Sequence, residues 1–315
     1  MSQIAELANV SAMTVSRVLN NSPSVLPETR EKVLQIARQL GYEHYPNALS
    51  RMLRGERSRS IGILACFARP NLTGEVLYRI GRKLFPSNYV SYIVDTYADP
   101  VVTLQALKTL AERRTEGVIH FSFNSQELNG DVTALLKKIG SSVIITHERQ
   151  NIPFAQIYCG WSPGVDDVVK YFKKKNSRCP VLLKESTNAS CHQAFEAACK
   201  KYGFADWKVI TCPAEKFNSE RQDGIPGDAI FASSEKYHPQ LEQITDHGRK
   251  LPLVMLMDDF LISHIRPEYP VLRRREPEAG VLAVKMLFDQ INQKPFAQLS
   301  AEMPMEFVEN INTNL

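Results

Sequence analysis

The sequence lacks the features that mark several large classes of protein. It contains no run of about 18 uncharged apolar residues, so no membrane span is predicted. Its first residues, MSQIAE, have neither a basic nor an apolar segment, so no secretory signal is predicted. The six cysteines form no CxxC pair and no zinc-site spacing. We therefore predict reduced thiols, a cytoplasmic location and no metal site.

Motifs of enzymes are missing as well. We find neither a Walker loop nor a GxGxxG motif, so nothing favours a nucleotide-dependent reaction. No Ser/His/Asp set or carboxylate pair stands out, and Cys191 and His192 are sequence neighbours, which do not face each other on a helix. The sequence predicts no catalytic residue, no cofactor and no enzyme.

What the sequence does have is an ordinary globular composition with an uneven charge. Of its 315 residues, 43% are apolar and 23% charged, which fits about two domains. The net charge is +4, and residues 1–60 hold eight Lys or Arg against five acidic residues. Most of the positive excess thus lies in a fifth of the chain. This indicates an end that binds a polyanion, although a solvated basic face fits the charge equally well.

A short helical pattern and a turn begin the chain. Ile4, Leu7 and Ala8 have helical spacing, which predicts that they share an inward face. Asn9 follows, and asparagine tolerates the left-handed conformation that a tight turn between helices requires.

A second helix is predicted over residues 11–20. The Ser11 hydroxyl is suited to cap it, and Val15, Val18 and Leu19 form one apolar face. The opposite face is mostly polar and consists of Ala12, Met13, Ser16, Arg17 and Asn20.

A third helix is predicted from Pro27, which suits a first helical turn, to Gly41, which suits the position after the last turn. Its inward face is predicted to be Val33, Ile36, Ala37 and Leu40.

Two short helices around a tight turn, braced by a third, form a helix-turn-helix unit. Its second helix enters a major groove, where Arg17 suits guanine, and Ala12 and Met13 suit thymine methyl groups. Phosphate contacts are predicted for Ser11, Thr14, Ser16 and Asn20. Periodicity alone fits a generic three-helix bundle with a solvated Arg17 equally well.

Residue identities and spacings are more specific than this periodicity. Residues 4–20 read IAELANVSAMTVSRVLN, and they are followed by PETREKV at 27–33, LGY at 40–42 and PNA at 46–48. This pattern resembles the headpiece of the lactose-repressor (LacI/GalR-type) family of bacterial transcription regulators. The resemblance implies that the helix near Ser11 reads the major groove. Two departures are a start about four residues shorter and Leu26 in place of a capping serine.

The segment 46–59 is expected to be a hinge. Alone it is too short for a stable helix, which suits a segment that orders on DNA. The resemblance implies a hinge helix in the minor groove, with Leu53 as a wedge between base pairs. Packing of apolar hinge residues against the next domain is the alternative. The predicted groove residues are Asn47, Ala48, Arg51, Leu53 and Arg54.

Beyond residue 60, apolar strands alternate with amphipathic helices. Strands are expected near 60–66, 90–94, 117–121, 142–145, 180–183, 207–211, 228–232, 253–257 and 303–308. Helices are expected near 74–85, 102–114, 129–138, 163–174, 189–202 and 235–247. The alternation predicts parallel, doubly wound sheets, and the length fits two subdomains. The resemblance implies that these subdomains are interleaved and similar to a periplasmic binding protein, so the expected fold class is α/β, a helix-turn-helix headpiece plus this two-subdomain core.

The resemblance implies an effector site between the two subdomains. The family's gripping Arg corresponds to Cys191, however, so a standard sugar effector is in doubt. Trp161 and Phe67 fit packing as well as ligand stacking, His147 and His192 fit ordinary roles, and Asp258 also fits a helix cap. The predicted effector residues are Phe67, Asn71, Asn124, His147, Trp161, Cys191, Ser233 and Asp258.

We therefore expect a headpiece over 1–45, a hinge over 46–59 and an effector-binding and dimerisation core over 60–315. The predicted function is a homodimeric repressor that binds a palindromic DNA operator under small-molecule control, with no membrane contact. The alternative is a soluble protein that binds a sugar-like small molecule and has a vestigial headpiece.

Overall fold

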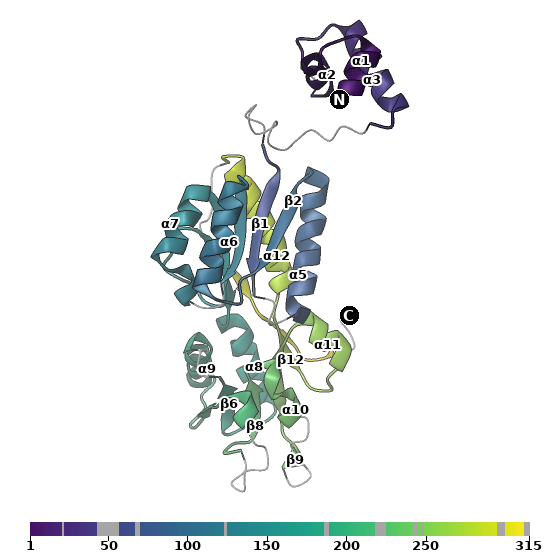
Figure 1. Ribbon diagram of the computed structural model, residues 1–315. Coiled ribbons are helices and arrows are strands. Elements are labelled where there is room, and N and C mark those ends of the chain that lie inside the picture. Colours follow the sequence, from purple (N-terminus) through teal and green to yellow (C-terminus); the bar gives the residue numbers. More distant parts are fainter. Residues whose placement is uncertain are drawn as a thin grey trace. The chain divides into compact units, whose positions relative to one another are not determined.

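The structure, a computed structural model, describes residues 1–20, 22–42, 57–66, 70–122, 125–185, 189–217, 225–241, 245–246, 249–294 and 300–311. The chain divides into two compact units, Met1–Ser58 and Arg59–Leu315. The described part of the first unit is helical, whereas that of the second consists of sheets flanked by helices (Figure 1).

The first unit contains α1 (Ser2–Ala8), α2 (Ala12–Leu19) and α3 (Pro27–Gln39). The turn between α1 and α2 has Asn9 in the left-handed conformation, with φ of 56°. This confirms the predicted turn, because asparagine accepts that conformation at lower cost than most residues.

The core of this unit is small and comes from α1, α2 and α3. Its buried members are Ile4, Ala5, Ala8, Val15, Val18, Val33 and Ala37. Two predicted core residues were wrong, since Leu7 is 56% exposed and Leu40 is 40% exposed. Helices this short enclose only a few side chains, and Ala5 rather than Leu7 fills the inward face of α1.

The first sheet of the second unit has the strand order β13-β5-β4-β3-β1-β2, and all its pairs are parallel. Its strands are β1 (Ser60–Ala65), β2 (Val90–Asp95), β3 (Gly117–Ser122), β4 (Ser141–Thr146), β5 (Ala155–Gly160) and β13 (Ser300–Pro304).

Helices cover both faces of this sheet. Alternate side chains of a strand point to opposite faces, so Ile61 and Ile63 pack in one cluster and Leu64 in another. The first cluster includes residues of α5 (Pro70–Leu84) and α12 (Glu276–Ile291), and the second includes residues of α6 (Pro100–Glu112) and α7 (Gly130–Ile139). This is the doubly wound arrangement that the sequence predicted.

The second sheet has the order β14-β12-β11-β8-β6-β7, and only β14 runs antiparallel to its neighbour. Its strands are β6 (Pro180–Lys184), β7 (Lys208–Thr211), β8 (Ala229–Ala232), β11 (Leu253–Met257), β12 (Val271–Arg273) and β14 (Glu306–Val308).

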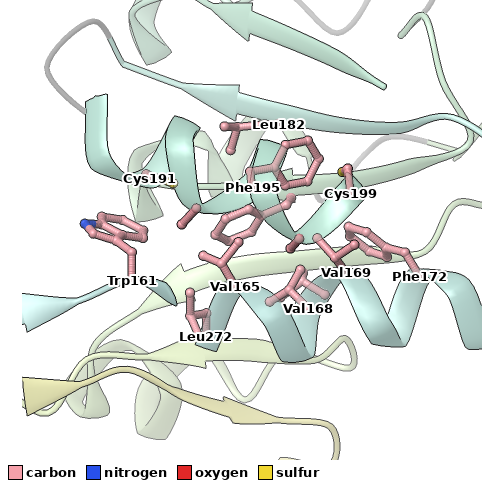
Figure 2. Packing of buried hydrophobic residues seen from close by; sticks show 14 of the residues in the cluster. Trp161, Val165, Val168, Val169, Phe172, Leu182, Cys191, Phe195, Cys199 and Leu272 are labelled. Atoms are coloured by element: carbon pink, nitrogen blue, oxygen red, sulfur yellow. The ribbon is translucent and has the colours of Figure 1, made fainter. Parts of the chain in front are cut away.

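One face of the second sheet packs against α8 (Ser162–Lys174) and α9 (Ala189–Lys201) through rings such as Phe172 and Phe195 (Figure 2). The other face packs against residues of α10 (His238–Leu241) and α11 (Asp259–Ile265). None of the helices in the described ranges combines the length and apolar character that crossing a membrane requires.

The chain passes between the two sheets three times. It leaves the first sheet after β5, returns from β12 into α12, and leaves again between β13 and β14. The two sheets are therefore interleaved along the sequence, and the crossing segments lie at their shared border.

Two predicted core elements were wrong. The helix expected over 235–247 is a 3-10 turn at Glu235–Tyr237, the four-residue α10, and a short hairpin of β9 (Thr245–Asp246) and β10 (Arg249–Lys250). The strand expected over 303–308 is split between β13 and β14, because the chain changes sheets at Met305.

Burial of His120 on β3 makes the stability of the core depend on pH. The ring is fully buried, neither ring nitrogen has a hydrogen-bond partner among the described residues, and burial lowers the pKa of His120 to about 4. In the unfolded chain the His120 ring therefore takes up a proton near pH 6.5, whereas in the folded chain it stays neutral until the pH approaches 4. The contribution of the neutral ring to the free energy of unfolding is complete above about pH 6.5 and is lost as the pH falls towards 4.

We predict that His120→Leu makes the protein less sensitive to acid. Between pH 7 and pH 5, the free energy of unfolding of the variant should fall by about 2 kcal/mol less than that of the wild type. Urea unfolding at the two pH values measures this difference. His264→Leu, which removes an exposed ring of α11, is the control and should follow the wild type. An unchanged pH dependence in His120→Leu would contradict the assignment.

Candidate functional site

The outward face of α2 carries the three residues predicted to read bases. Ala12, Met13 and Arg17 are exposed, whereas Val15 and Val18 are buried in the core of the unit. Met13 leaves 64% of its surface exposed. The helix thus presents both an apolar contact and a guanidinium group on its free side.

Of the residues predicted to contact phosphate, Ser11 and Thr14 lie at the amino end of α2, whereas Ser16 and Asn20 lie in and after its second half. The Ser11 hydroxyl accepts a hydrogen bond from the backbone N–H of Thr14 at 3.1 Å, which confirms the predicted cap, and lies 2.9 Å from the Thr14 hydroxyl. At the other end, the Asn20 amide donates to the Ser16 carbonyl oxygen at 2.8 Å. These side chains therefore fix the limits of the helix.

The predicted hinge residues lie outside the described residues. They are Asn47, Ala48, Arg51, Leu53 and Arg54. Of the predicted effector residues, Phe67 and Asn124 lie outside as well, and of Asn71 only the backbone within α5 is described.

The other predicted effector residues lie at or near the carboxyl ends of strands or the beginnings of helices. His147 follows β4, Trp161 follows β5, Ser233 follows β8, Asp258 follows β11 and Cys191 lies in the first turn of α9. Parallel sheets form ligand crevices beyond the carboxyl ends of their strands.

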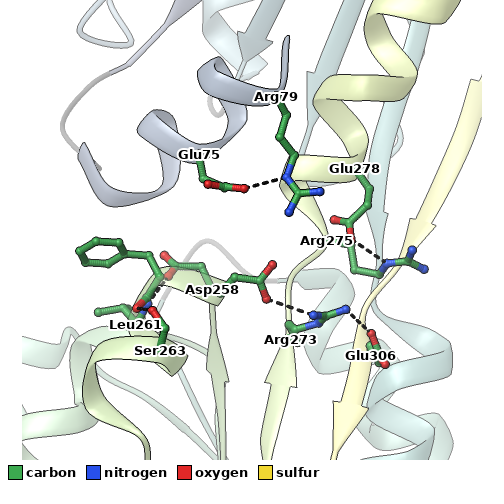
Figure 3. Close-up of polar contacts among 11 residues, drawn as sticks. Glu75, Arg79, Asp258, Leu261, Ser263, Arg273, Arg275, Glu278 and Glu306 are labelled. Carbon is green, nitrogen blue, oxygen red and sulfur yellow. Dashed lines mark hydrogen bonds and ion pairs between the residues drawn. The ribbon is translucent and has the colours of Figure 1, made fainter. Parts of the chain in front are cut away.

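Asp258 caps α11. Its Oδ1 atom accepts a hydrogen bond from the Leu261 N–H at 2.7 Å, and the residue is only 7% exposed (Figure 3). Burial raises the pKa of the Asp258 carboxyl. Of the two roles that the sequence left open for Asp258, a helix cap and an effector contact, the structure shows the helix cap.

Trp161 and Cys191 belong to the apolar core of the second subdomain. Cys191 is fully buried, and burial raises the pKa of its thiol. Trp161 lies at the edge of the same cluster with its indole nitrogen directed away from Val165 (Figure 2). That nitrogen has no hydrogen-bond partner in the part of the chain that the structure describes. His192 pairs with Glu196 at 3.4 Å on the surface of α9.

A buried ionic cluster around Arg274 was missed by the sequence analysis. The Arg274 side chain, only 6% exposed, directly follows β12. Its Nη1 atom lies 3.4 Å from Glu235 Oε2, and its Nε atom lies 4.0 Å from Glu276 Oε1. Burial opposes the charge of Arg274, but the two carboxylates outweigh it and raise the pKa of the guanidinium group.

The flanking arginines make separate pairs on either side of this cluster. Arg273 lies 3.3 Å from Asp259 and 2.6 Å from Glu306, and Arg275 lies 3.8 Å from Glu278 (Figure 3). The sequence signal for all three was the run RRREPE at 273–278, whose charges precede a helix with proline in its first turn.

A second missed group lies beside the cluster. The donor atoms of His147, Cys159 and Glu276 lie within 4.8 Å of one another. Burial and, secondarily, the Glu276 carboxylate raise the pKa of the Cys159 thiol to about 12. Cysteine spacing could not reveal this group, because its members come from three separate parts of the chain.

A polar contact joins the two subdomains near the same border. Glu148 follows β4 of the first sheet, and its Oε1 atom accepts hydrogen bonds from the backbone N–H and the hydroxyl of Ser190 in α9. Groups of both subdomains therefore meet at the border of the two sheets.

Both units of the chain are similar to known proteins. The family model described as bacterial regulatory proteins, lacI family, matches residues 1–47. The sucrose operon repressor of Pediococcus pentosaceus is 35% identical over 39% of this chain, which spans only 37% of that relative's length. The HTH-type transcriptional repressor PurR of Mannheimia succiniciproducens is 29% identical over 97% of this chain and 96% of the relative.

The fold is similar to that of a solved structure of the lac repressor dimer bound to operator and the anti-inducer ONPF. The TM-score is 0.77 at 18% identity, over 98% of this chain and 97% of that chain. The predicted fold class, a helix-turn-helix headpiece plus a two-subdomain α/β core, is confirmed.

A helix-turn-helix unit joined to such a core defines a DNA-binding transcription regulator. The comparisons support a regulator of the lacI family of bacterial regulatory proteins, because the family model matches residues 1–47 and a PurR repressor is similar over nearly the whole chain. Because these relatives are repressors, the prediction of a regulator rather than an enzyme is confirmed. They do not favour the alternative of a binding protein with a vestigial headpiece.

We predict that Arg274→Met destabilises the core by about 3–5 kcal/mol, because the buried Glu276 and the largely enclosed Glu235 would both lose the guanidinium group between them. Chemical unfolding of the purified protein measures this loss. Arg275→Met removes the neighbouring, more exposed arginine and should cost at most about 1 kcal/mol. Equal losses in the two variants would contradict the role given to the buried cluster.

Proposed function

We propose that the protein is a homodimeric repressor that binds a pseudo-palindromic DNA operator and responds to an effector bound in its core. The observation that carries this proposal is the free face of α2, where Ala12, Met13 and Arg17 are exposed above a fixed apolar core. A helix presented in this way fits the width of a major groove.

Base reading and phosphate contact are assigned to different parts of α2. Arg17 is proposed to read guanine, and Ala12 and Met13 to contact thymine methyl groups. The residues proposed to contact phosphate are Ser11, Thr14, Ser16 and Asn20. Support for the first two comes from their position at the amino end of the helix, where N–H groups and the helix dipole favour an anion.

The predicted boundaries of 1–45 for the headpiece, 46–59 for the hinge and 60–315 for the core are kept as proposals. The hinge is proposed to order on DNA, with Leu53 inserted between base pairs and with Asn47, Ala48, Arg51 and Arg54 in the minor groove. The support for this assignment is the resemblance in sequence to the family. A protein that binds DNA in this way would act in the cytoplasm.

We predict that Arg17→Ala weakens operator binding by about 1–3 kcal/mol and relaxes the preference at one base pair of each half-site. Fluorescence anisotropy with an operator and its single-base-pair variants measures both effects. Arg38→Ala removes an exposed arginine from the last turn of α3 and should keep the preference. If Arg17→Ala weakens binding to random DNA and to operator by the same free energy, Arg17 does not read bases.

An exposed apolar surface supports the proposed dimer. We call this surface the β2 face; its exposed members are Tyr78, Phe85, Val90, Tyr92, Ile93, Tyr97 and Val101. They lie on α5, on the edge strand β2 and in the turns and helix next to them. A groove of about 780 Å³ between β2 and α6 continues this face. A face of this kind is suited to a second copy related by a twofold axis.

We predict that Ile93→Asp converts the dimer into a monomer, because the contact would bury two unpaired carboxylates. Analytical ultracentrifugation at micromolar concentration measures the change. Thr211→Asp places the same charge on β7, the edge strand of the other sheet, and should leave a dimer. A dimer that survives Ile93→Asp would move the interface to another face.

Control by an effector is proposed at the border of the two sheets. The support is the set of buried polar groups there, including Arg274, Glu276 and Asp258, together with the Glu148–Ser190 contact between the subdomains. A ligand that favours one arrangement of the subdomains shifts DNA affinity by the difference in its own affinity for the two states.

A further inference from the structure

Three side chains with metal-binding atoms converge where the first sheet ends. The ring of His147, the thiol of Cys159 and the carboxylate of Glu276 place their donor atoms within 4.8 Å of one another. His147 and Cys159 are half-buried, and Glu276 is buried.

The fold brings these groups together from three elements. β4 and β5 are parallel neighbours with Thr146 opposite Tyr158, so the next residues, His147 and Cys159, continue the same register. Glu276 begins α12, which packs against both strands. The group therefore rests on regular secondary structure rather than on one loop.

The donor set indicates which ion would bind. A thiolate with an imidazole and a carboxylate suits zinc and similar transition-metal ions, whereas magnesium and calcium prefer oxygen ligands alone. Bonds of about 2.0–2.3 Å in a tetrahedral site space the ligand atoms about 3.3–3.7 Å apart. Side-chain movements of about an ångström complete such a site. Three protein ligands leave the fourth position to water, which suits reversible binding.

The surrounding charges favour a cation. Asp258, Glu235 and Glu276 are the acidic groups that act on Arg274, so carboxylates outnumber the guanidinium group here. The contact between Arg274 Nε and Glu276 Oε1, at 4.0 Å, is long for an ion pair. Arg274 lies closer to Glu235, at 3.4 Å, and keeps this shorter contact when Glu276 turns towards an entering ion.

We propose that His147, Cys159 and Glu276 bind a transition-metal ion of the zinc class, and that this ion is an effector of the core. The regulatory half of this proposal rests on the proposed function. Binding releases the thiol proton to solvent and forms the metal–sulfur bond. Cys159 precedes the first crossing between the sheets and Glu276 follows the second. The ion thus joins two of the three segments that connect the subdomains.

Cobalt tests the site, because a cobalt–thiolate bond absorbs in the near ultraviolet. The chelator-treated full-length protein, kept reduced, should bind one equivalent of Co²⁺ with this absorption, and Zn²⁺ should displace it. Cys159→Ser should abolish the band. His147→Asn and Glu276→Gln should weaken cobalt binding at least about tenfold, since changes to groups behind the ligands already cost 10–100-fold.

Cys179→Ser is the matched control. Its thiol is also half-buried and lies 3.6 Å from a carboxylate oxygen of Asp206, but it is remote in sequence from the three ligands and should leave the band unchanged. In the wild type, Zn²⁺ should also protect Cys159 from alkylation, which mass spectrometry can locate. This measurement uses the wild type alone, so it holds even if a variant fails to fold. No band at equimolar cobalt, a band that survives Cys159→Ser, or a band lost in Cys179→Ser would overturn the site.

Operator affinity separates the site from its regulatory role. Zn²⁺ should change the affinity of the wild type for operator by at least about fivefold and that of Cys159→Ser by less than twofold. Metal binding without a change in affinity would overturn the regulatory half. Specific operator binding with no metal binding would overturn the metal site and leave the proposed function standing.

Discussion

The buried charge of Arg274 is the constraint on which the arrangement of the core depends. A guanidinium group withdrawn from water must face carboxylates, and Glu235 and Glu276 supply them from two different elements. One follows β8 and the other begins α12, so the end of the second sheet is tied to the helix that returns to the first. The polar border between the sheets, where an effector is proposed to act, therefore contains the pairing of Arg274 with Glu235 and Glu276.

Much of the fold could be predicted from local sequence. Ser11, Asn9 and the apolar spacing of α2 specify a cap, a turn and a helix within a few residues of one another. Apolar strands alternating with amphipathic helices likewise predicted two parallel sheets. The failures came where tertiary packing overrides local preference, as with exposed Leu7 or the residues expected to form a helix over 235–247. Met305, where one expected strand became two, marks a change of sheet that periodicity cannot show.

The site was harder to predict than the fold. Residues on one helix, such as Met13 and Arg17, share a face that spacing reveals. The group of His147, Cys159 and Glu276 is assembled by sheet order and by a crossing of the chain, which no spacing encodes. For that reason the sequence predicted no metal site, while the structure brings three ligand types together. Asp258 matched the expected position, but its carboxylate caps α11.

The central claim is that α2 recognises specific bases in duplex DNA. Selection of the full-length protein against a pool of randomised duplexes tests this claim most directly. The enriched sequences should contain two related half-sites whose centres lie about one helical turn, or a multiple of it, apart. Binding to the selected duplex should be at least about 10³-fold tighter than to a scrambled one and should weaken steeply with salt. A pool that remains random after repeated rounds would contradict the claim.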